Sequence, residues 1–371
     1  MIVSSRAGCE HESGKLLILV AKGVWGRTGM GERKAVFFAA DAAYLPLAWV
    51  AARDVAAQPG RDFDVCLLLP EDVAATPPPG VRVLRVRLPE VLAQVAGPAH
   101  MSPFAYARLA APALWLSDYD KLLYLDSDIR VSGDLSPLFA LEMGEALAAM
   151  VEDCGRYLGA AGGREDWDEY RTRTGLRLDA PYFNSGVILM NAARWRAEAL
   201  WAQAASFIAA RGAQLRFMDQ DALNVLGGRI LELSPRWNFC THYMGLGLEG
   251  VVAPRVRHYL NVLKPWRDPE WATLYGKADV RAFGAAFAGS PWPGFVHQGL
   301  VSALPWRKRA ALAAAKAARH VPEAALAGHM ENFIGLAPRL WRDVRAGFAE
   351  GAKSYVDLSS EEAAAWKAAL T

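Results

Sequence analysis

The sequence has few cysteines, little net charge and no long hydrophobic run. Its four cysteines are widely separated and form no C-x-x-C pair, which argues against a zinc cluster or a disulfide framework and fits a reducing cytoplasm: Cys9, Cys66, Cys154 and Cys240. A formal net charge of +2 is too small for a general polyanion binder, so no nucleic-acid partner is expected. The early apolar run Leu16–Ala21 is far shorter than the ~20 residues that span a bilayer, and it makes a poor signal peptide.

Short apolar runs alternate with longer helical stretches from Ala35 onward. The runs "AVFFAAD", "DFDVCLLLP", "VRVLRVRL" and "KLLYLDSD" predict strands, and residues 44–57 and 104–116 predict helices. A further strand is expected at 186–190, and a helix begins at Asp219. Strands that alternate with helices favour a mostly parallel sheet covered on both faces.

Acidic residues stand at the ends of the predicted strands. In such a sheet the ligand crevice lies beyond the carboxyl ends of the strands, where Asp41, Asp126 and Asp128 fall. We expect Asp126 and Asp128 on a loop between a strand and a helix. Two carboxylates there suit Mg²⁺ or Mn²⁺, which could neutralise a diphosphate leaving group.

Two other readings of this D-x-D pair remain open. Either aspartate could simply cap a helix or complete a turn. A phosphatase of the aspartyl-phosphate type also places D-x-D after a strand, but its motif normally lies near the start of the domain with Thr or Val soon after. Here Ile129 and Arg130 follow.

A second polar segment, "HYLNVLKPW", contains His258 and Lys264. A neutral imidazole suits Mn²⁺ as a third ligand and an ammonium suits a phosphate, although a lone histidine is more often structural. His242 lacks the K-P-W continuation, so we expect a packing or acceptor-side role for it. We expect Trp237 and Asn238 to pack or hydrogen-bond beneath the site, outside the catalytic set.

The C-terminal part is basic and contains aromatic residues. Between Trp306 and Arg345, eight Lys or Arg residues stand against three acids. One reading is a helical cap packed on the core with a solvated face. The other is a surface in peripheral contact with an anionic membrane.

Five ordered segments resemble the family 8 glycosyltransferases, retaining enzymes that include bacterial lipopolysaccharide galactosyl- and glucosyltransferases, glycogenin and galactinol synthase. They are "AYARLAAPALWLSDYDKLLYLDSDIRVSGDLSPLF", "YFNSGVILMNAARW", "DQDALNVL", "RWNF" and "HYLNVLKPW". The resemblance covers about residues 35–266. It implies an α/β fold, a GT-A-type Rossmann-like single domain with a mostly parallel central sheet at 34–280. An N-terminal extension (1–33) and a basic helical C-terminal segment (281–371) would flank it.

The resemblance also implies a role for each matching residue. The expected metal ligands for Mn²⁺, with Mg²⁺ as the alternative ion, are Asp126, Asp128 and His258. The expected nucleotide contacts are Asp41 at the base and Lys264 at the phosphates. The donor-sugar residues would be Arg108, Asn184 and Asp219, and the catalytic pair would be Asp219 and Gln220, with Gln220 beneath the anomeric carbon.

These roles imply Mn²⁺-dependent, retaining transfer of galactose or glucose from a UDP-hexose to a saccharide or glycolipid acceptor. Lipopolysaccharide or another surface glycan is the expected acceptor, and the expected location is the cytoplasm or the inner face of the cell membrane. The alternative is a catalytically inactive nucleotide-sugar-binding module. It is motivated by Ala42 and Ala43, where bacterial members often read "FAADDNY", and by Asn261, where the family commonly has glycine.

Overall fold

The computed structural model describes residues 31–95, 102–155, 164–225, 229–244, 247–260, 264–267, 277–295 and 338–371. The chain divides into two units, Met1–Gly31 and Glu32–Thr371, and the description concerns the second. The expected extension therefore falls almost wholly outside the described residues.

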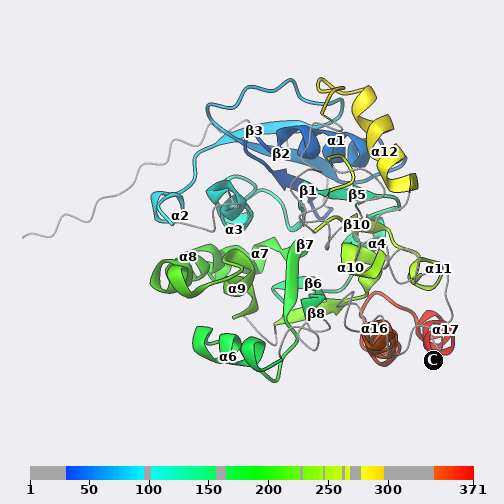
Figure 1. Cartoon of the computed structure of the whole chain (residues 1–371). Helices are drawn as coiled ribbons and strands as arrows, with labels where there is room; N and C mark the ends of the chain where they lie inside the picture. Colours follow the sequence, from blue (N-terminus) through cyan, green and yellow to red (C-terminus); the bar gives the residue numbers. More distant parts are fainter. Residues whose placement is uncertain are drawn as a thin grey trace, which may run out of the picture. The chain divides into compact units, whose positions relative to one another are not determined.

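A seven-stranded sheet forms the centre of the fold (Figure 1). Its order is β3-β2-β1-β4-β7-β6-β8. The neighbours from β3 to β4 pair in parallel, β7 runs antiparallel to β4 and β6, and β6 pairs with β8 in parallel. The predicted, mostly parallel sheet is thus confirmed. The strands are β1 (Lys34–Ala39), β2 (Asp64–Pro70), β3 (Arg82–Val86), β4 (Lys121–Leu125), β6 (Ala148–Glu152), β7 (Phe183–Asn191) and β8 (Ile230–Leu233).

Both faces of this sheet are covered, because alternate residues of each strand enter two separate hydrophobic cores. Phe38 belongs to one core with α1, and Phe37 belongs to the other. The second core packs under α3, α7 and α8, which lie together in Figure 1. These helices are α1 (Leu45–Ala56), α3 (Ala107–Leu114), α7 (Ala192–Ala197) and α8 (Leu200–Arg211), with α2 (Glu90–Ala93) and the 3-10 helix η1 (Pro103–Tyr106) before α3.

A second, three-stranded sheet has the order β5-β10-β9. The strands are β5 (Ile129–Val131), β9 (Phe239–Cys240) and β10 (Val256–His258). The expectation of a strand-to-helix loop at Asp126 and Asp128 was therefore wrong: the loop joins β4 to β5, and α4 (Ser136–Phe139) comes later. β5 pairs antiparallel with β10, which sets Ile129 opposite His258. A three-residue strand is too short to show a periodicity in the sequence.

In Figure 1, α12 lies beside α1, α6 lies at the bottom, and α10, α11, α16 and α17 lie at the lower right. α6 (Arg164–Thr174) lies between β6 and β7 in the sequence. The others are η2 (Gly212–Gln214), α9 (Asp219–Asn224), η3 (Pro235–Trp237), α10 (Thr241–Met244), α11 (Glu249–Val252), α12 (Lys277–Ala288), α16 (Pro338–Gly351) and α17 (Ser360–Leu370). The predicted boundary at residue 280 falls inside α12, and the domain limits remain a prediction.

The described end of the C-terminal segment packs on the core. Val344 and Phe348 of α16 are buried, and α17 begins with a capping box formed by Ser359 and Glu362. Arg345 donates to the carbonyls of the last turn of α17. This part matches the helical-cap reading, while residues 296–337, with most of the basic side chains, lie outside the described residues. Within the described ranges no helix combines the length and hydrophobicity needed to cross a membrane.

Candidate active site

An open cleft lies at the carboxyl ends of β1 and β4, where the topology of an open α/β sheet predicts a ligand site. Its empty volume is about 660 Å³. Asp41, Arg108, Asp126 and Asp128 are four of the predicted site residues, and all four line it. Asp41 uses one carboxylate oxygen to accept hydrogen bonds from the backbone of residues 43 and 44, at 3.0 Å each, which fixes the turn before α1.

Asp126, Asp128 and His258 form a compact group of three metal-ligand types. One ligand atom from each lies within 4.8 Å of the others. The His258 Nε2 atom is 3.1 Å from Asp128 Oδ1 and 3.6 Å from Asp126 Oδ2. The pairing of β5 with β10 brings the histidine to this place, 130 residues beyond Asp128 in the sequence.

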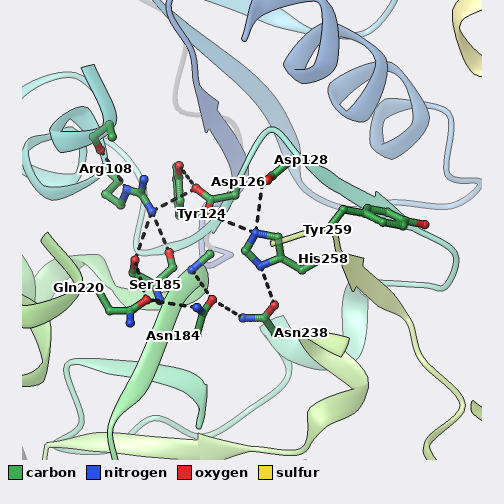
Figure 2. Close-up of polar contacts among 12 residues, drawn as sticks. Arg108, Tyr124, Asp126, Asp128, Asn184, Ser185, Gln220, Asn238, His258 and Tyr259 are labelled. Carbon is green, nitrogen blue, oxygen red and sulfur yellow. Dashed lines mark hydrogen bonds and ion pairs between the residues drawn. The ribbon is translucent and has the colours of Figure 1, made fainter. Parts of the chain in front are cut away.

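The other ring nitrogen of His258 contacts Asn238. The Nδ1 atom is 2.9 Å from Asn238 Oδ1, and Asn238 Nδ2 donates to Asn184 Oδ1 at 2.8 Å (Figure 2). Because an amide oxygen only accepts, the Nδ1–H of His258 is the donor, and the Nε2 atom faces the two carboxylates. Asn238 therefore orients a predicted metal ligand. The sequence analysis placed Asn238 beneath the site but did not predict this role.

Gly186 provides the space for the histidine ring. A Cβ atom built on Gly186 would lie 2.1 Å from His258 Cε1 and 2.9 Å from Asp126 Oδ2. The backbone oxygen of Gly186 also accepts a hydrogen bond from the Asp126 N–H at 2.8 Å. The glycine in "FNSG" is thus required by the close approach of two candidate metal ligands.

Lys264 pairs with Asp128. The Nζ atom is 2.6 Å from Asp128 Oδ2 and also donates to the backbone oxygen of Tyr259. Burial raises the pKa of Asp128, but Lys264 and His258 outweigh this effect and hold the pKa well below its usual range. Burial lowers the pKa of His258, and the Asp128 carboxylate reverses that, so the net shift is upward. A bound divalent cation would oppose this pull of the carboxylates.

Arg108 connects the metal group to the start of α9. Its Nη1 is 3.1 Å from Asp126 Oδ1, and its Nε is 3.2 Å from Asp219 Oδ2. The guanidinium also stacks over the Tyr124 ring at 4.5 Å, and the Tyr124 hydroxyl donates to Asp126 Oδ1 at 2.6 Å. Burial raises the pKa of Asp219, with Arg108 acting in the opposite direction. Such a buried pair requires both partners, because either charge alone would be uncompensated.

The predicted sugar residues Asn184 and Gln220 lie together next to this pair. Gln220 Oε1 accepts from Asn184 Nδ2 at 3.1 Å and from the Ser185 N–H at 3.0 Å (Figure 2). Asp153, which sequence reasoning missed, accepts from Asn184 at 2.8 Å and from Gln220 at 3.3 Å. Its position directly after β6, which runs parallel to β4, was the signal that could have found it.

All nine predicted site residues therefore lie in one connected region: Asp41, Arg108, Asp126, Asp128, Asn184, Asp219, Gln220, His258 and Lys264. Two carboxylates and one imidazole form a donor set that fits a hard or borderline divalent cation such as Mn²⁺. Asn261 and the side chain of His242 lie outside the described part of the chain, so the predictions for them are not addressed.

The central sheet, with an acidic loop after β4 and a second small sheet that supplies the histidine, is an α/β architecture of the GT-A type. The sequence model of glycosyl transferase family 8 matches residues 81–270. The chain belongs to this family.

Individual relatives agree with this assignment. The chain is 31% identical over 222 residues to a lipopolysaccharide 1,2-glucosyltransferase of Escherichia coli (strain K12), a match that covers 55% of this chain and 60% of the relative. It is 30% identical over 199 residues to the lipopolysaccharide glucosyltransferase WaaO of the same strain, covering 50% and 55%. The matches thus span little more than half of the length of these curated relatives.

A solved structure supports the fold. The crystal structure of the galactosyltransferase LgtC in complex with donor and acceptor sugar analogues superposes with a TM-score of 0.51 at 25% sequence identity. The match covers 74% of this chain and 99% of LgtC. The predicted fold class is confirmed by this likeness.

Proposed function

We propose that the protein transfers galactose or glucose from a UDP-sugar to a saccharide acceptor, with retention of anomeric configuration and dependence on Mn²⁺. The observation that carries the proposal is the direct contact between the candidate metal group and the candidate sugar residues, made by Arg108 between Asp126 and Asp219. The names of the relatives and of LgtC support a hexose donor and a lipopolysaccharide or other surface-glycan acceptor.

Different residues would act on the two halves of the UDP-sugar donor, the nucleoside diphosphate and the sugar. Asp126, Asp128 and His258 would hold the cation, which when bound supplies Lewis-acid stabilisation of the departing diphosphate. Lys264 contributes a compact positive charge for the phosphates. Asp41, which precedes α1 and lines the same cleft, would bind the nucleoside.

Gln220 acts on the sugar as a dipole. Retaining transfer is usually achieved with a carboxylate nucleophile near the anomeric carbon, but Gln220 is an amide whose Oε1 already accepts from Asn184 and Ser185. Front-side substitution fits this arrangement: the acceptor oxygen attacks as the bond to UDP breaks, the acceptor proton passes to the departing diphosphate oxygen, and Gln220 stabilises the positive charge on the sugar.

A panel of UDP-sugars, assayed for UDP release with Mn²⁺ and with excess chelator, tests the proposal. We expect UDP-galactose or UDP-glucose to be turned over in Mn²⁺ and not after chelation. We also expect Asp126→Asn to lose this activity while its circular dichroism spectrum is retained. Donor binding without turnover, even with mixtures of saccharide acceptors, would instead support the inactive binding module.

The acceptor and the location form a second part of the proposal. We propose a saccharide or glycolipid acceptor and a location in the cytoplasm, with the basic C-terminal segment available for contact with the inner face of the membrane. The support is the basic composition between residues 306 and 345 together with the names of the lipopolysaccharide-modifying relatives.

A further inference from the structure

Asp357 makes a specific contact far from the family match. It lies between α16 and α17, and its carboxylate accepts three hydrogen bonds: from the Ser234 N–H at 2.6 Å, from Ser234 Oγ at 2.6 Å and from Trp237 Nε1 at 2.8 Å. Ser234 and Trp237 are buried. The neighbouring Val356 N–H donates to the backbone oxygen of Glu232 in β8 at 3.1 Å.

The turn that Asp357 holds leads directly to the histidine of the candidate metal group. Within η3, the Trp237 N–H donates to Ser234 O and the Asn238 N–H donates to Pro235 O, both at 3.2 Å. Asn238 then places its Oδ1 atom 2.9 Å from His258 Nδ1. One turn of chain therefore separates the Asp357 carboxylate from the amide that orients His258.

General packing does not account for this contact. The C-terminal helices have another anchor on the core, because Phe348 of α16 packs against Tyr243 with ring centroids 5.0 Å apart. Glu362 of α17 reaches the same turn as Asp357, because it pairs with Arg236 at 3.0 Å. Burying a carboxylate costs free energy unless hydrogen bonds from the protein replace its hydrogen bonds to water. Here all three replacement hydrogen bonds come from the turn that precedes Asn238, and one of them fixes the Trp237 ring.

We propose that Asp357 is a positioning residue for the candidate metal site. It fixes the turn at residues 234–237, so that Asn238 holds the His258 ring with Nε2 directed at Asp126 and Asp128. The inference rests on the proposed function for the identity of the ion, and it extends the site to a residue 87 positions beyond the end of the family match at 270. The C-terminal segment then completes the active site as well as covering the core.

The test compares Asp357→Ala and Asp357→Asn with the control Arg345→Ala, which removes hydrogen bonds between α16 and α17. Mn²⁺ binding to the full-length protein without donor is measured by calorimetry, and folding by thermal denaturation. We expect Asp357→Ala to weaken Mn²⁺ binding by about 3- to 10-fold, less than the 10- to 100-fold typical of residues that touch a ligand directly. Asp357→Asn, which keeps one acceptor oxygen, should fall between Asp357→Ala and the wild type. Arg345→Ala should stay within about twofold of the wild type, because these hydrogen bonds join α16 to α17 and do not involve the turn at residues 234–237.

A second measurement separates this inference from the proposed function. NMR of the metal-free protein observes the Nδ1–H proton of His258, which is held by the hydrogen bond to Asn238, and we expect this proton to exchange with water more slowly in the wild type than in Asp357→Ala. Wild-type protein that binds no Mn²⁺ would reject the proposed function, and the NMR comparison would still decide the role of Asp357. A folded Asp357→Ala with unchanged Mn²⁺ affinity and an unchanged exchange rate of the His258 Nδ1–H proton would overturn the inference.

If Asp357→Ala does not fold, Trp237→Phe decides the question. It keeps an aromatic ring in the turn and removes only the Nε1–H donor to Asp357. Weaker Mn²⁺ binding with faster exchange of the His258 Nδ1–H proton supports positioning by Asp357, whereas wild-type values for both overturn it.

Discussion

Gly186→Ala is the sharpest test of the candidate metal group, because it adds one methyl group at the point where two candidate ligands meet. The new Cβ would lie 2.1 Å from His258 Cε1 and 2.6 Å from Nδ1. Carbon atoms in contact prefer a separation of about 3.5 Å or more, so the ring must retreat by roughly 1.4 Å. Gly186 has no positive φ angle, so the effect is a collision and not backbone strain.

The surroundings of His258 leave little room for that retreat. The ring is 1% exposed and is held by Asn238 on one side and Asp128 on the other. Movement breaks one of these contacts and takes Nε2 away from the carboxylates. A displacement of about 1 Å in an active site can cost 10²-fold in rate, and overpacking a buried site typically costs about 1–3 kcal/mol in stability.

We therefore expect Gly186→Ala to lower Mn²⁺-dependent transfer by about 10²-fold and to weaken Mn²⁺ binding, while the protein remains folded. Transfer rates over a range of Mn²⁺ concentrations, with urea unfolding in parallel, check this. The matched control is Gly284→Ala in α12, where a Cβ would meet nothing within 4 Å. A folded Gly186→Ala protein with a wild-type rate and a wild-type Mn²⁺ requirement would refute the reasoning.

Two further variants test other parts of the site. Gln220→Ala should reduce kcat by about 10²-fold without abolishing transfer, since it removes an electrostatic contribution and not a nucleophile; a glycosyl adduct trapped on Gln220 of the wild type, detected by mass spectrometry, would contradict this. Tyr170→Phe should lower the free energy of unfolding by about 1 kcal/mol, because the Tyr170 hydroxyl donates to Asp221 and accepts from the Arg216 N–H. Urea denaturation measures that loss, and an unchanged midpoint with an unchanged slope would show that the contact contributes nothing.

The main sheet could be predicted because its strands are long and buried on both faces. β1 and β2 each contain five consecutive buried residues, which leaves an apolar run in the sequence. The small sheet could not be predicted from such runs. β5, β9 and β10 have two or three residues each, and Ile129 pairs with His258 across a large separation in sequence. Only the tertiary structure determines that pairing.

The candidate site could likewise be predicted only in part. Residues at the ends of predictable strands, such as Asp41 and Asp126, could be proposed from position and chemistry, and the ordered motifs added the rest through the family resemblance. Contacts made by side chains from distant segments left no pattern in the sequence. No period or motif indicates that Asp357 accepts a hydrogen bond from Trp237, 120 residues earlier.

The two cationic side chains of the site, Arg108 and Lys264, differ in their freedom to move. Arg108 is buried, contacts both Asp126 and Asp219 and also donates to backbone carbonyls, so its planar guanidinium is fixed in place. Lys264 is bound through a single flexible ammonium to Asp128 and to one backbone oxygen.

Asp126, Asp128 and Asp219 are the carboxylates that pair with Arg108 and Lys264, so within these pairs the carboxylates outnumber the two cationic side chains by one. A divalent cation bound at Asp126 and Asp128 would neutralise the negative charge of Asp128, which Lys264 otherwise neutralises. The ammonium would then be available to the diphosphate, whereas Arg108 would continue to hold Asp126 and Asp219. The difference between the two cations thus supports the proposed roles of Lys264 at the leaving group and of Arg108 in the framework that joins the metal and sugar halves of the site.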